Sequence, residues 1–252
     1  MIIGIVQVRM ASTRLPKKAM VDLCGRPLLW HVIDRARKSK FIDKIVIATT
    51  ESPEDDVIGK FCSDIKVDIF RGNADDVLDR FYQCAKKYLA DIIVRITADD
   101  PFKEPAIIDR AIKLLISDKS LDYVSNTVKP SYPEGLDVEA FTFKTLEEAW
   151  SESRLPSERE HVTPYIWKNP LQFSILNFEN KIDLSSMRWT LDNEADLRFT
   201  KEVYARLYVP GSIFKLDAIL ALLEKEPWIS AINGGIERNT GYKKSVIQEN
   251  KK

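Results

Sequence analysis

The sequence predicts an α/β protein with a doubly wound, mostly parallel sheet. Short apolar runs without strict alternation recur along the first half of the chain, and such runs are typical of strands buried on both faces. Segments with apolar residues at helical spacing separate these runs, as in a βαβ fold. The 252 residues can bury a full core, so we expect one domain over residues 1–240 and a polar tail over 241–252.

Each element of the first half follows from its residues. Pro27 and Pro53 stand where helices begin, because proline is tolerated in a first helical turn. His31 lies off the apolar stripe of the helix after Pro27 and is expected at the surface. The expected strands cover residues 2–8, 44–50, 67–70, 91–97 and 121–125, and the expected helices begin near residues 28, 53, 75 and 105.

The alternation of strands and helices changes after residue 125. Two prolines and a glycine within residues 128–135 indicate a loop. Residues 136–143 alternate strictly between apolar and polar, which is typical of a half-exposed strand. Residues 130–180 as a whole break the βα pattern and are expected to form a small insertion. The last expected elements are a strand over 187–191 and helices over 194–208 and 215–224.

The composition argues against several function classes. The 38 basic and 38 acidic residues balance, which gives no reason to expect a nucleic acid or an anionic membrane as a partner. The three cysteines are far apart and form no CxxC pair, so neither a zinc site nor a disulfide framework is indicated. No apolar run approaches 18 residues, and the first 30 residues lack the order of a signal peptide. Together these features favour a cytoplasmic protein.

The first buried strand opens into a strongly basic loop. Four cations and two hydroxyl groups fall within ten positions: Arg9, Ser12, Thr13, Arg14, Lys17 and Lys18. Hydroxyl groups, backbone N–H groups and cations all bind phosphate oxygens, and open α/β sheets bind ligands beyond the carboxyl ends of their strands. The loop is therefore a candidate triphosphate cradle. The alternative is a solvated basic turn.

Two aspartates follow later strands. Asp99 comes directly after the strand over 91–97, where Pro101 fixes the turn. Mg²⁺ prefers oxygen ligands and usually takes one or two carboxylates together with substrate phosphates. For Asp99 an Asx turn or a helix N-cap is an equal alternative. Asp192 begins an acidic first helical turn, and its ordinary interpretation is an N-cap.

These motifs resemble those of one family. The segment VRMASTRLPKKAM resembles the N-terminal signature of cytidylyltransferases that make CMP-activated acidic sugars, and it is closest to the spore-coat polysaccharide group. FRGNADDVLDRF, VRITADDP and RWTLDNEADL resemble further segments of that family. Ala11 and Lys17 stand where the family pattern has glycine, which shifts phosphate binding from bare backbone toward side chains. The resemblance covers about residues 1–240 and implies a Rossmann-like nucleotidyltransferase fold.

The resemblance also implies the roles of the candidate residues. The implied nucleotide-binding residues are Arg9, Ser12, Arg14, Lys18, Arg71 and Asp99. The implied catalytic residues are Arg14, Lys18, Asp99 and Asp192, of which the two aspartates would also bind Mg²⁺.

The segments YPEGLDVEAF and PSEREHVTPY resemble the acceptor side of the same family. Asp137 and Glu139 would share one strand face there, and a solvated face is the equal alternative for each. Arg159 is favoured as the partner of a sugar carboxylate, because a guanidinium can bind a carboxylate through two hydrogen bonds. His161 is either a general base or an ordinary hydrogen-bonded histidine. In the family the insertion packs against a second subunit, so the resemblance implies a homodimer.

These expectations combine into nucleotidyl transfer with Mg²⁺ as cofactor. The enzyme would transfer CMP from CTP to a nonulosonic or deoxy-octulosonic acid and release pyrophosphate, in cell-surface polysaccharide biosynthesis. The preference for CTP rests on the family likeness alone. A metal-dependent glycosyltransferase is disfavoured because the chain has no Asp-x-Asp motif. A non-catalytic nucleotide-binding module, and a sugar phosphate or phosphonate as acceptor, are the remaining alternatives.

Overall fold

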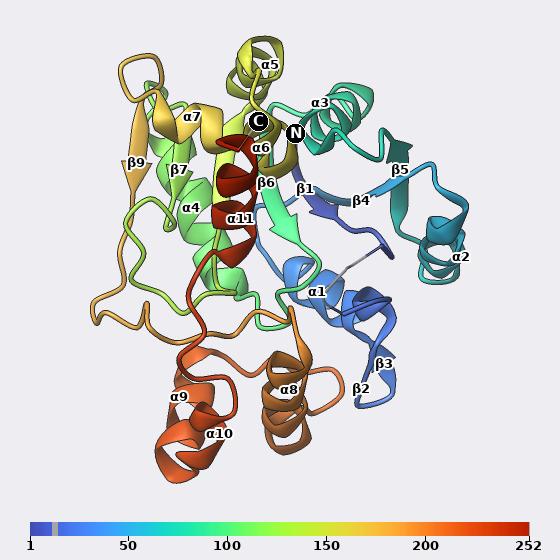
Figure 1. Ribbon diagram of the computed structural model, residues 1–252, viewed down its shortest axis with the longest axis vertical. Coiled ribbons are helices and arrows are strands. Elements are labelled where there is room, and N and C mark those ends of the chain that lie inside the picture. Colours follow the sequence, from blue (N-terminus) through green and yellow to red (C-terminus); the bar gives the residue numbers. More distant parts are fainter. Residues whose placement is uncertain (12–14, 252) are drawn as a thin grey trace.

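The strand order of the main sheet determines which loops meet. The computed structural model describes residues 1–11 and 15–251. The main sheet formed by these residues has seven strands (Figure 1), in the spatial order β5 (Asp68–Gly72), β4 (Lys44–Thr50), β1 (Ile2–Gln7), β6 (Ile92–Thr97), β8 (Glu139–Thr142), β7 (Tyr123–Ser125) and β9 (Ile175–Asn177). Neighbouring strands in it are parallel except β8, which is antiparallel to β6 and β7. The prediction of a doubly wound, mostly parallel sheet is confirmed.

The chain changes direction across the sheet at β1. After β1 it adds β4 and β5 on one side, and it then returns to place β6 on the other side of β1. Strands β1 and β6 end at the same level of the sheet, because their last residues, Gln7 and Thr97, pair with each other. Loops that leave adjacent strands in opposite directions open a crevice, which is where open α/β sheets bind ligands. Lys18 and Asp99 lie in the loops that follow β1 and β6.

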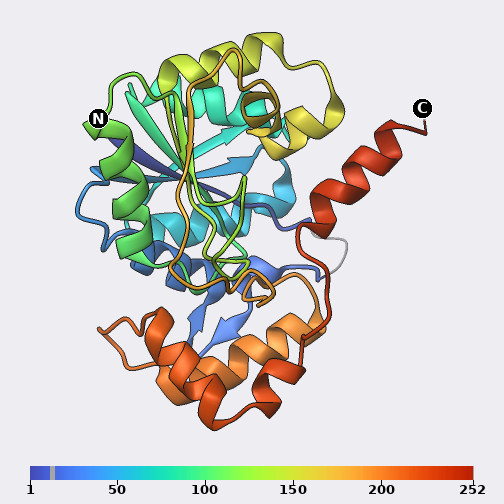
Figure 2. The same ribbon diagram turned by 90° about the vertical axis from the view of Figure 1, so that its left-hand side faces the viewer.

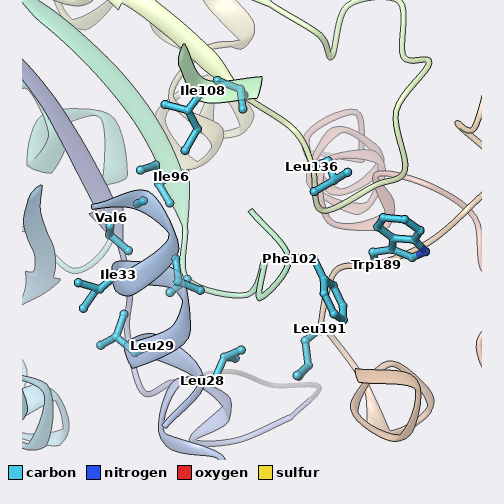
Figure 3. Packing of buried hydrophobic residues seen from close by; sticks show 14 of the residues in the cluster. Val6, Leu28, Leu29, Ile33, Ile96, Phe102, Ile108, Leu136, Trp189 and Leu191 are labelled. Atoms are coloured by element: carbon cyan, nitrogen blue, oxygen red, sulfur yellow. The ribbon is translucent and has the colours of Figure 1, made fainter. Parts of the chain in front are cut away.

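Helices cover both faces of the sheet because successive strand residues alternate between the faces. One face lies under α3 (Val77–Lys87), α5 (Phe143–Glu152) and α7 (Pro164–Lys168). The other lies under α1 (Leu28–Ala36), α2 (Asp56–Asp64) and α4 (Pro105–Ser117). Ile3 and Ile5 belong to the hydrophobic core under α3, α5 and α7, which we call the first core. Val6 belongs to the second core, under α1, α2 and α4. Figure 3 shows Val6 and Ile96 of the second core near Ile33 of α1.

A smaller lobe lies beyond the carboxyl ends of the strands (Figure 2). It consists of β2 (Asp22–Leu23), β3 (Arg26–Pro27), α8 (Glu194–Leu207), α9 (Leu216–Lys225) and α10 (Trp228–Ala231). Phe102, in the loop after β6, contacts the rings of Trp189, Phe199, Tyr204 and Phe214. The lobe and the α1 side of the sheet therefore share one core, which holds the residues before α8 against the loop after β6.

The lobe also explains why the expectation for His31 was wrong. His31 is only 3% exposed, because Tyr204 and Tyr208 of the lobe pack edge-on against its ring. Its Nε2 lies 2.8 Å from the carbonyl oxygen of Leu23. The outer face of α1 is thus buried by residues that come some 170 positions later.

The segment expected to be a polar tail instead forms helix α11 (Thr240–Glu249). It has no buried residue, and it packs against α6 (Pro156–His161) through polar and aromatic contacts. The Glu249 carboxylate accepts a hydrogen bond from the backbone N–H of Ser157 (2.9 Å), and the Tyr242 ring lies edge-on to Trp167. Figure 2 shows α11 reaching away from the body of the molecule. The sequence pattern did not indicate this helix because no apolar stripe marks it.

Two other segments differ from expectation. Residues 130–180, expected to form an insertion, contribute β8 and β9 to the main sheet. Residues 187–191 form no strand, and their only pairing of that kind within the described chain is an isolated bridge between Glu134 and Arg188. Short 3₁₀ turns complete the described structure, η1 (Lys18–Met20) and η2 (Pro53–Asp55). No helix of the described residues is both long enough and apolar enough to cross a membrane.

Candidate active site

Lys18 joins the two candidate metal ligands at the switch point of the sheet. Its ammonium group donates hydrogen bonds to Asp99 Oδ2 (2.7 Å), to Asp192 Oδ1 (2.7 Å) and to the carbonyl oxygen of Leu191 (3.2 Å). The lysine opens η1, directly after Lys17, which has a left-handed backbone (φ 60°). The structure thus brings together three side chains from the beginning, middle and end of the chain.

Backbone contacts hold the two aspartate loops together. The N–H of Leu191 donates to the carbonyl oxygen of Asp99 (2.8 Å). The same segment passes close to Gly135, whose backbone has φ +107°. A Cβ atom at Gly135 would lie 2.7 Å from the carbonyl carbon of Trp189, so only glycine fits this close approach. The position of Asp192 is therefore fixed by two neighbouring segments, the loop after β6 and the backbone at Gly135.

The charges of the three side chains support one another. Burial alone would lower the pKa of Lys18, but the two adjacent carboxylates outweigh burial and raise it. Burial alone would raise the pKa of Asp99, but the Lys18 ammonium lowers it to about 2. Lys18 and Asp99 are therefore both ionised at neutral pH, and a cation stands between the two aspartates.

Arg188 holds Asp192 from the side opposite Lys18. Its Nη2 lies 3.3 Å from Asp192 Oδ2, and its Nε and Nη2 donate to the fully buried Asp196 (2.9 and 3.0 Å). The Asp192 N–H also donates to Asp196 (3.0 Å). The N-cap of α8 is Asn193, whose side chain accepts from the Asp196 N–H. The ordinary interpretation of Asp192 as the N-cap is therefore wrong.

The two carboxylates suit a divalent cation of the Mg²⁺ type. Their oxygens are each 2.7 Å from the same nitrogen, so they lie at most twice that distance apart. Mg²⁺ binds oxygens at about 2.0–2.1 Å and commonly takes two carboxylates, with substrate phosphates and water completing the shell. No group of three or more acidic, histidine or cysteine ligands is found within residues 1–11 and 15–251. The pair would thus hold a metal together with further ligands from a substrate or from water.

A first cavity of about 370 Å³ lies on one side of these three residues. Besides Lys18 and the two aspartates it is lined by three cations, Arg9, Arg80 and Lys244. Arg80, on α3, is 2% exposed, and its Nε has no hydrogen-bond partner among the described residues. Burial, together with the charge of Arg9, lowers the pKa of Arg80 to about 10. The described lining thus holds four cations and three carboxylates, of which Glu160 is the third, and the unused donor of Arg80 suits the first cavity to an anion. Ser12 and Arg14 lie outside the described residues.

A second cavity of about 270 Å³ lies on the other side and shares Asp99, Asp192 and His161 with the first. Its wall pairs each cation with a carboxylate: Arg95 with Glu139, Lys103 with Asp100, and Arg238 with Asp137. Two of the acidic residues predicted for the acceptor side, Asp137 and Glu139, are thus in this cavity. Backbone carbonyls and hydroxyls complete a strongly polar surface.

Two carboxylates of the second cavity, Glu139 and Asp137, differ in how strongly their surroundings stabilise the ionised form. Glu139 accepts hydrogen bonds from Arg95, Tyr123 and Thr163, and although burial opposes ionisation, these partners lower its pKa. For Asp137, burial outweighs the nearby Arg238 and raises the pKa. Glu139 is thus a fixed anion of the wall, whereas Asp137 is the more easily protonated one.

His161 lines both cavities, at the base of α11. Its Nε2 lies 3.0 Å from the Ser245 hydroxyl of α11, and the ring lies edge-on to Tyr242. Burial lowers the pKa of His161 to about 4. The imidazole is therefore neutral at neutral pH, which suits a hydrogen-bonding partner at the boundary of the two cavities.

Two predicted arginines line neither cavity. Arg71 donates to the carbonyl oxygens of Thr50 and Ser52 (both 2.8 Å) and to Asp56 Oδ1 (2.6 Å), so it fastens β5 to the end of β4. Arg159 donates to Asp76 Oδ2 through Nε (2.8 Å) and Nη2 (2.5 Å), and its Nη1 donates to the carbonyl oxygen of Trp150 (2.7 Å). The structure does not bring either guanidinium group to the site.

The sequence analysis missed several cations of the site: Arg80, Arg95, Lys103, Arg188, Arg238 and Lys244. One of them carried a signal. Arg95 interrupts the otherwise apolar strand β6, and a charge inside a buried strand indicates a partner or a ligand. Lys244 lay in the segment that we expected to be a tail, and Arg238 lies shortly before it.

Comparisons with known proteins match this chain to one family. A family model described as "Cytidylyltransferase" matches residues 3–223. The spore coat polysaccharide biosynthesis protein SpsF of Bacillus subtilis is 31% identical, and the match covers 90% of this chain and 95% of SpsF. A 3-deoxy-manno-octulosonate cytidylyltransferase of Geobacter metallireducens is 33% identical over 120 residues, 48% of this chain and 46% of that protein. The solved structure of a cytidylyltransferase from Leptospira borgpetersenii superposes with a TM-score of 0.88 and 32% identity, covering 94% of this chain and 99% of that one.

Proposed function

Because the chain belongs to the cytidylyltransferase family and is a nucleotidyltransferase, we propose that it transfers CMP from CTP to a hydroxyl group of an acidic sugar and releases pyrophosphate. The observation that carries this proposal is the position of Lys18, Asp99 and Asp192 between an anion-binding cavity and a polar cavity. Two substrates in these cavities would meet at one charged centre.

In the proposed reaction the triphosphate lies in the first cavity. Arg9, Arg80 and Lys18 neutralise its oxygens, and Ser12 and Arg14 of the N-terminal loop complete the proposed binding set. Asp99 and Asp192 would hold Mg²⁺, which supplies charge stabilisation for the phosphates when it is bound. These residues position the reactants and stabilise charge, which is the main contribution of a protein to phosphoryl transfer.

The acceptor lies in the second cavity, with its hydroxyl group at the Asp99–Asp192 end. The acceptor oxygen forms a bond to the α-phosphorus, the bond from that phosphorus to the bridging oxygen breaks, and pyrophosphate leaves. The hydroxyl proton passes to water or to His161, which is neutral at neutral pH. Asp137 and Glu139, with Arg95 and Arg238 beside them, would bind the hydroxyl and carboxylate groups of the sugar.

The nature of the acceptor rests on relatives and on the resemblance of the acceptor-side segments. The name of the Geobacter relative gives an acidic sugar as acceptor, and that of SpsF gives polysaccharide biosynthesis. We therefore propose a nonulosonic or deoxy-octulosonic acid, used for a surface polysaccharide. A homodimer in the cytoplasm also belongs to this proposal.

The experiment is a screen of pyrophosphate release. CTP, UTP, ATP and GTP are each tested with a panel of nonulosonic acids, deoxy-octulosonic acid, sugar 1-phosphates, a phosphonate and buffer alone. We expect release only with CTP and an acidic sugar, and only when Mg²⁺ is added. Release with a sugar phosphate or phosphonate would change the acceptor class. Binding of CTP without any release would favour a nucleotide-binding module instead.

A further inference from the structure

The ammonium group of Lys18 occupies the place where a divalent cation would lie. We propose that Lys18 competes with the metal for the Asp99–Asp192 pair, so that the enzyme without nucleotide keeps this pair closed to the metal. The inference rests on the proposed function in one respect, which is that these two aspartates are the metal ligands.

Geometry makes the two cations competitors. The Lys18 nitrogen is 2.7 Å from one oxygen of each aspartate, and a metal bound to the same oxygens at about 2.0–2.1 Å would lie within about 5 Å of that nitrogen, so the two cations would repel each other. Asp192 cannot turn away easily, because Arg188 holds its other oxygen. The lysine side chain, with its flexible stem, is the member of the group that can move.

Charge favours the same conclusion. Lys18 is the counter-ion of both aspartates, and Asp99 has no other ion-pair partner among the described residues. Removal of the ammonium group would leave two carboxylates facing each other, and like charges at this distance repel unless a cation lies between them. A divalent cation should therefore bind more tightly when the Lys18 ammonium group is removed.

The first cavity gives Lys18 another place to go. Lys18 lines this cavity, and triphosphate oxygens there would offer its ammonium group a second set of anionic partners. When a triphosphate attracts the ammonium group, it no longer lies between the two carboxylates, and a metal can take its place. Nucleotide and metal would then favour each other's binding, and this coupling is reciprocal by thermodynamic linkage.

The test measures Mn²⁺ binding to the full-length protein without nucleotide or sugar, by electron paramagnetic resonance of the free ion. We expect Lys18→Met to bind Mn²⁺ at least tenfold more tightly than the wild type. The matched control is Lys17→Met, which removes the same charge from an exposed neighbour that lines neither cavity, and its Kd should equal that of the wild type. Asp99→Asn in the Lys18→Met background should abolish the gain.

A Kd for Lys18→Met that equals or exceeds that of the wild type overturns the proposal, and so does a gain that survives Asp99→Asn or that Lys17→Met reproduces. Lys18→Gln is the second variant, measured in the same way if Lys18→Met melts at a much lower temperature. The assay contains neither CTP nor sugar, so a failed pyrophosphate screen would refute the proposed function without deciding this test.

Discussion

Lys18 contacts both candidate metal ligands through one ammonium group. If it also neutralises the α-phosphate and the leaving group, its loss should resemble the loss of a donor that stabilises the transition state. Lys18→Ala should then lower turnover by roughly 10²–10³ at saturating substrates. Pyrophosphate release measures this, with the exposed Lys60→Ala as control. A turnover within about threefold of wild type would remove Lys18 from the mechanism.

Asp99 links the site to stability at acid pH. Its pKa in the folded protein is about 2, below the ordinary 3.8, so ionised Asp99 stabilises the fold above about pH 4. This stabilisation, about 2 kcal/mol, is lost as the pH falls from 4 through 2. Urea unfolding of wild type and Asp99→Asn should show a difference at pH 6 that narrows at pH 4 and narrows further at pH 3. A difference that stays constant with pH would contradict this account.

Single residues also show which members of the site could be predicted from the sequence and which could not. Lys18, Asp99 and Asp192 could be found because each sits in a motif that resembles a known family and that follows an expected strand or begins an expected helix. Arg71 and Arg159 sit in equally good motifs, but their guanidinium groups bind backbone carbonyls and aspartates that lie elsewhere in the fold. The partner that an arginine selects depends on tertiary contacts, which no local pattern contains.

Among the elements, the start of α8 depends on one buried cation. Arg188 joins the segment before α8 to Asp196 inside the helix and to Glu134. Because Asp196 is fully buried, Arg188→Met would leave an uncompensated charge and destabilise the protein by about 3–5 kcal/mol. Urea unfolding tests this against Arg206→Met, which removes two ion pairs at the surface, with Glu202 and Glu226, and should hardly change the free energy of unfolding. Equal effects of the two variants would refute the argument.

Helix α11 should contribute less to the stability of the fold than to substrate binding in the two cavities. It has no buried residue, so deletion of residues 240–252 should change the free energy of unfolding by less than about 1 kcal/mol. The same deletion removes Lys244 from the first cavity and Tyr242 from the second, so KM should rise for both substrates. Thermal melts and KM values check the two parts. The control Ile247→Ala changes an exposed α11 residue that lines neither cavity and should leave both quantities unchanged.

The elements that could be predicted are those with a marked apolar period. The buried strands and the helices between them follow it closely, and α8 appears at Glu194 as expected. Elements without such a period were missed or misplaced. Helix α11 was missed because its contacts are polar, and residues 187–191 form no strand because their backbone hydrogen bonds go to two separate residues, Glu134 and Asp99. His31 was misplaced because its cover comes from Tyr204 and Tyr208, far along the chain.

At the scale of the whole molecule, the strand order explains why the fold class was easier to predict than the site. A doubly wound sheet places the loops after β1 and β6 side by side whatever their sequences, so Lys18 and Asp99 could be expected to meet. The wall of the second cavity is different. It combines β6, β8 and the residues before α11, and only the packing of the lobe on the sheet decides that Arg238 reaches Asp137.

The distance along the chain between Lys18 and Asp192 has a consequence for biosynthesis. A ribosome that has made only the first half of the protein has already released β1, β4, β5 and β6, yet the second aspartate is still untranslated. Such a nascent chain could fold its parallel strands while it was still catalytically inactive. With Asp192 as the proposed second metal ligand, catalysis would begin only after the segment before α8 had been made and had reached Lys18, so a half-made copy would not consume nucleotide.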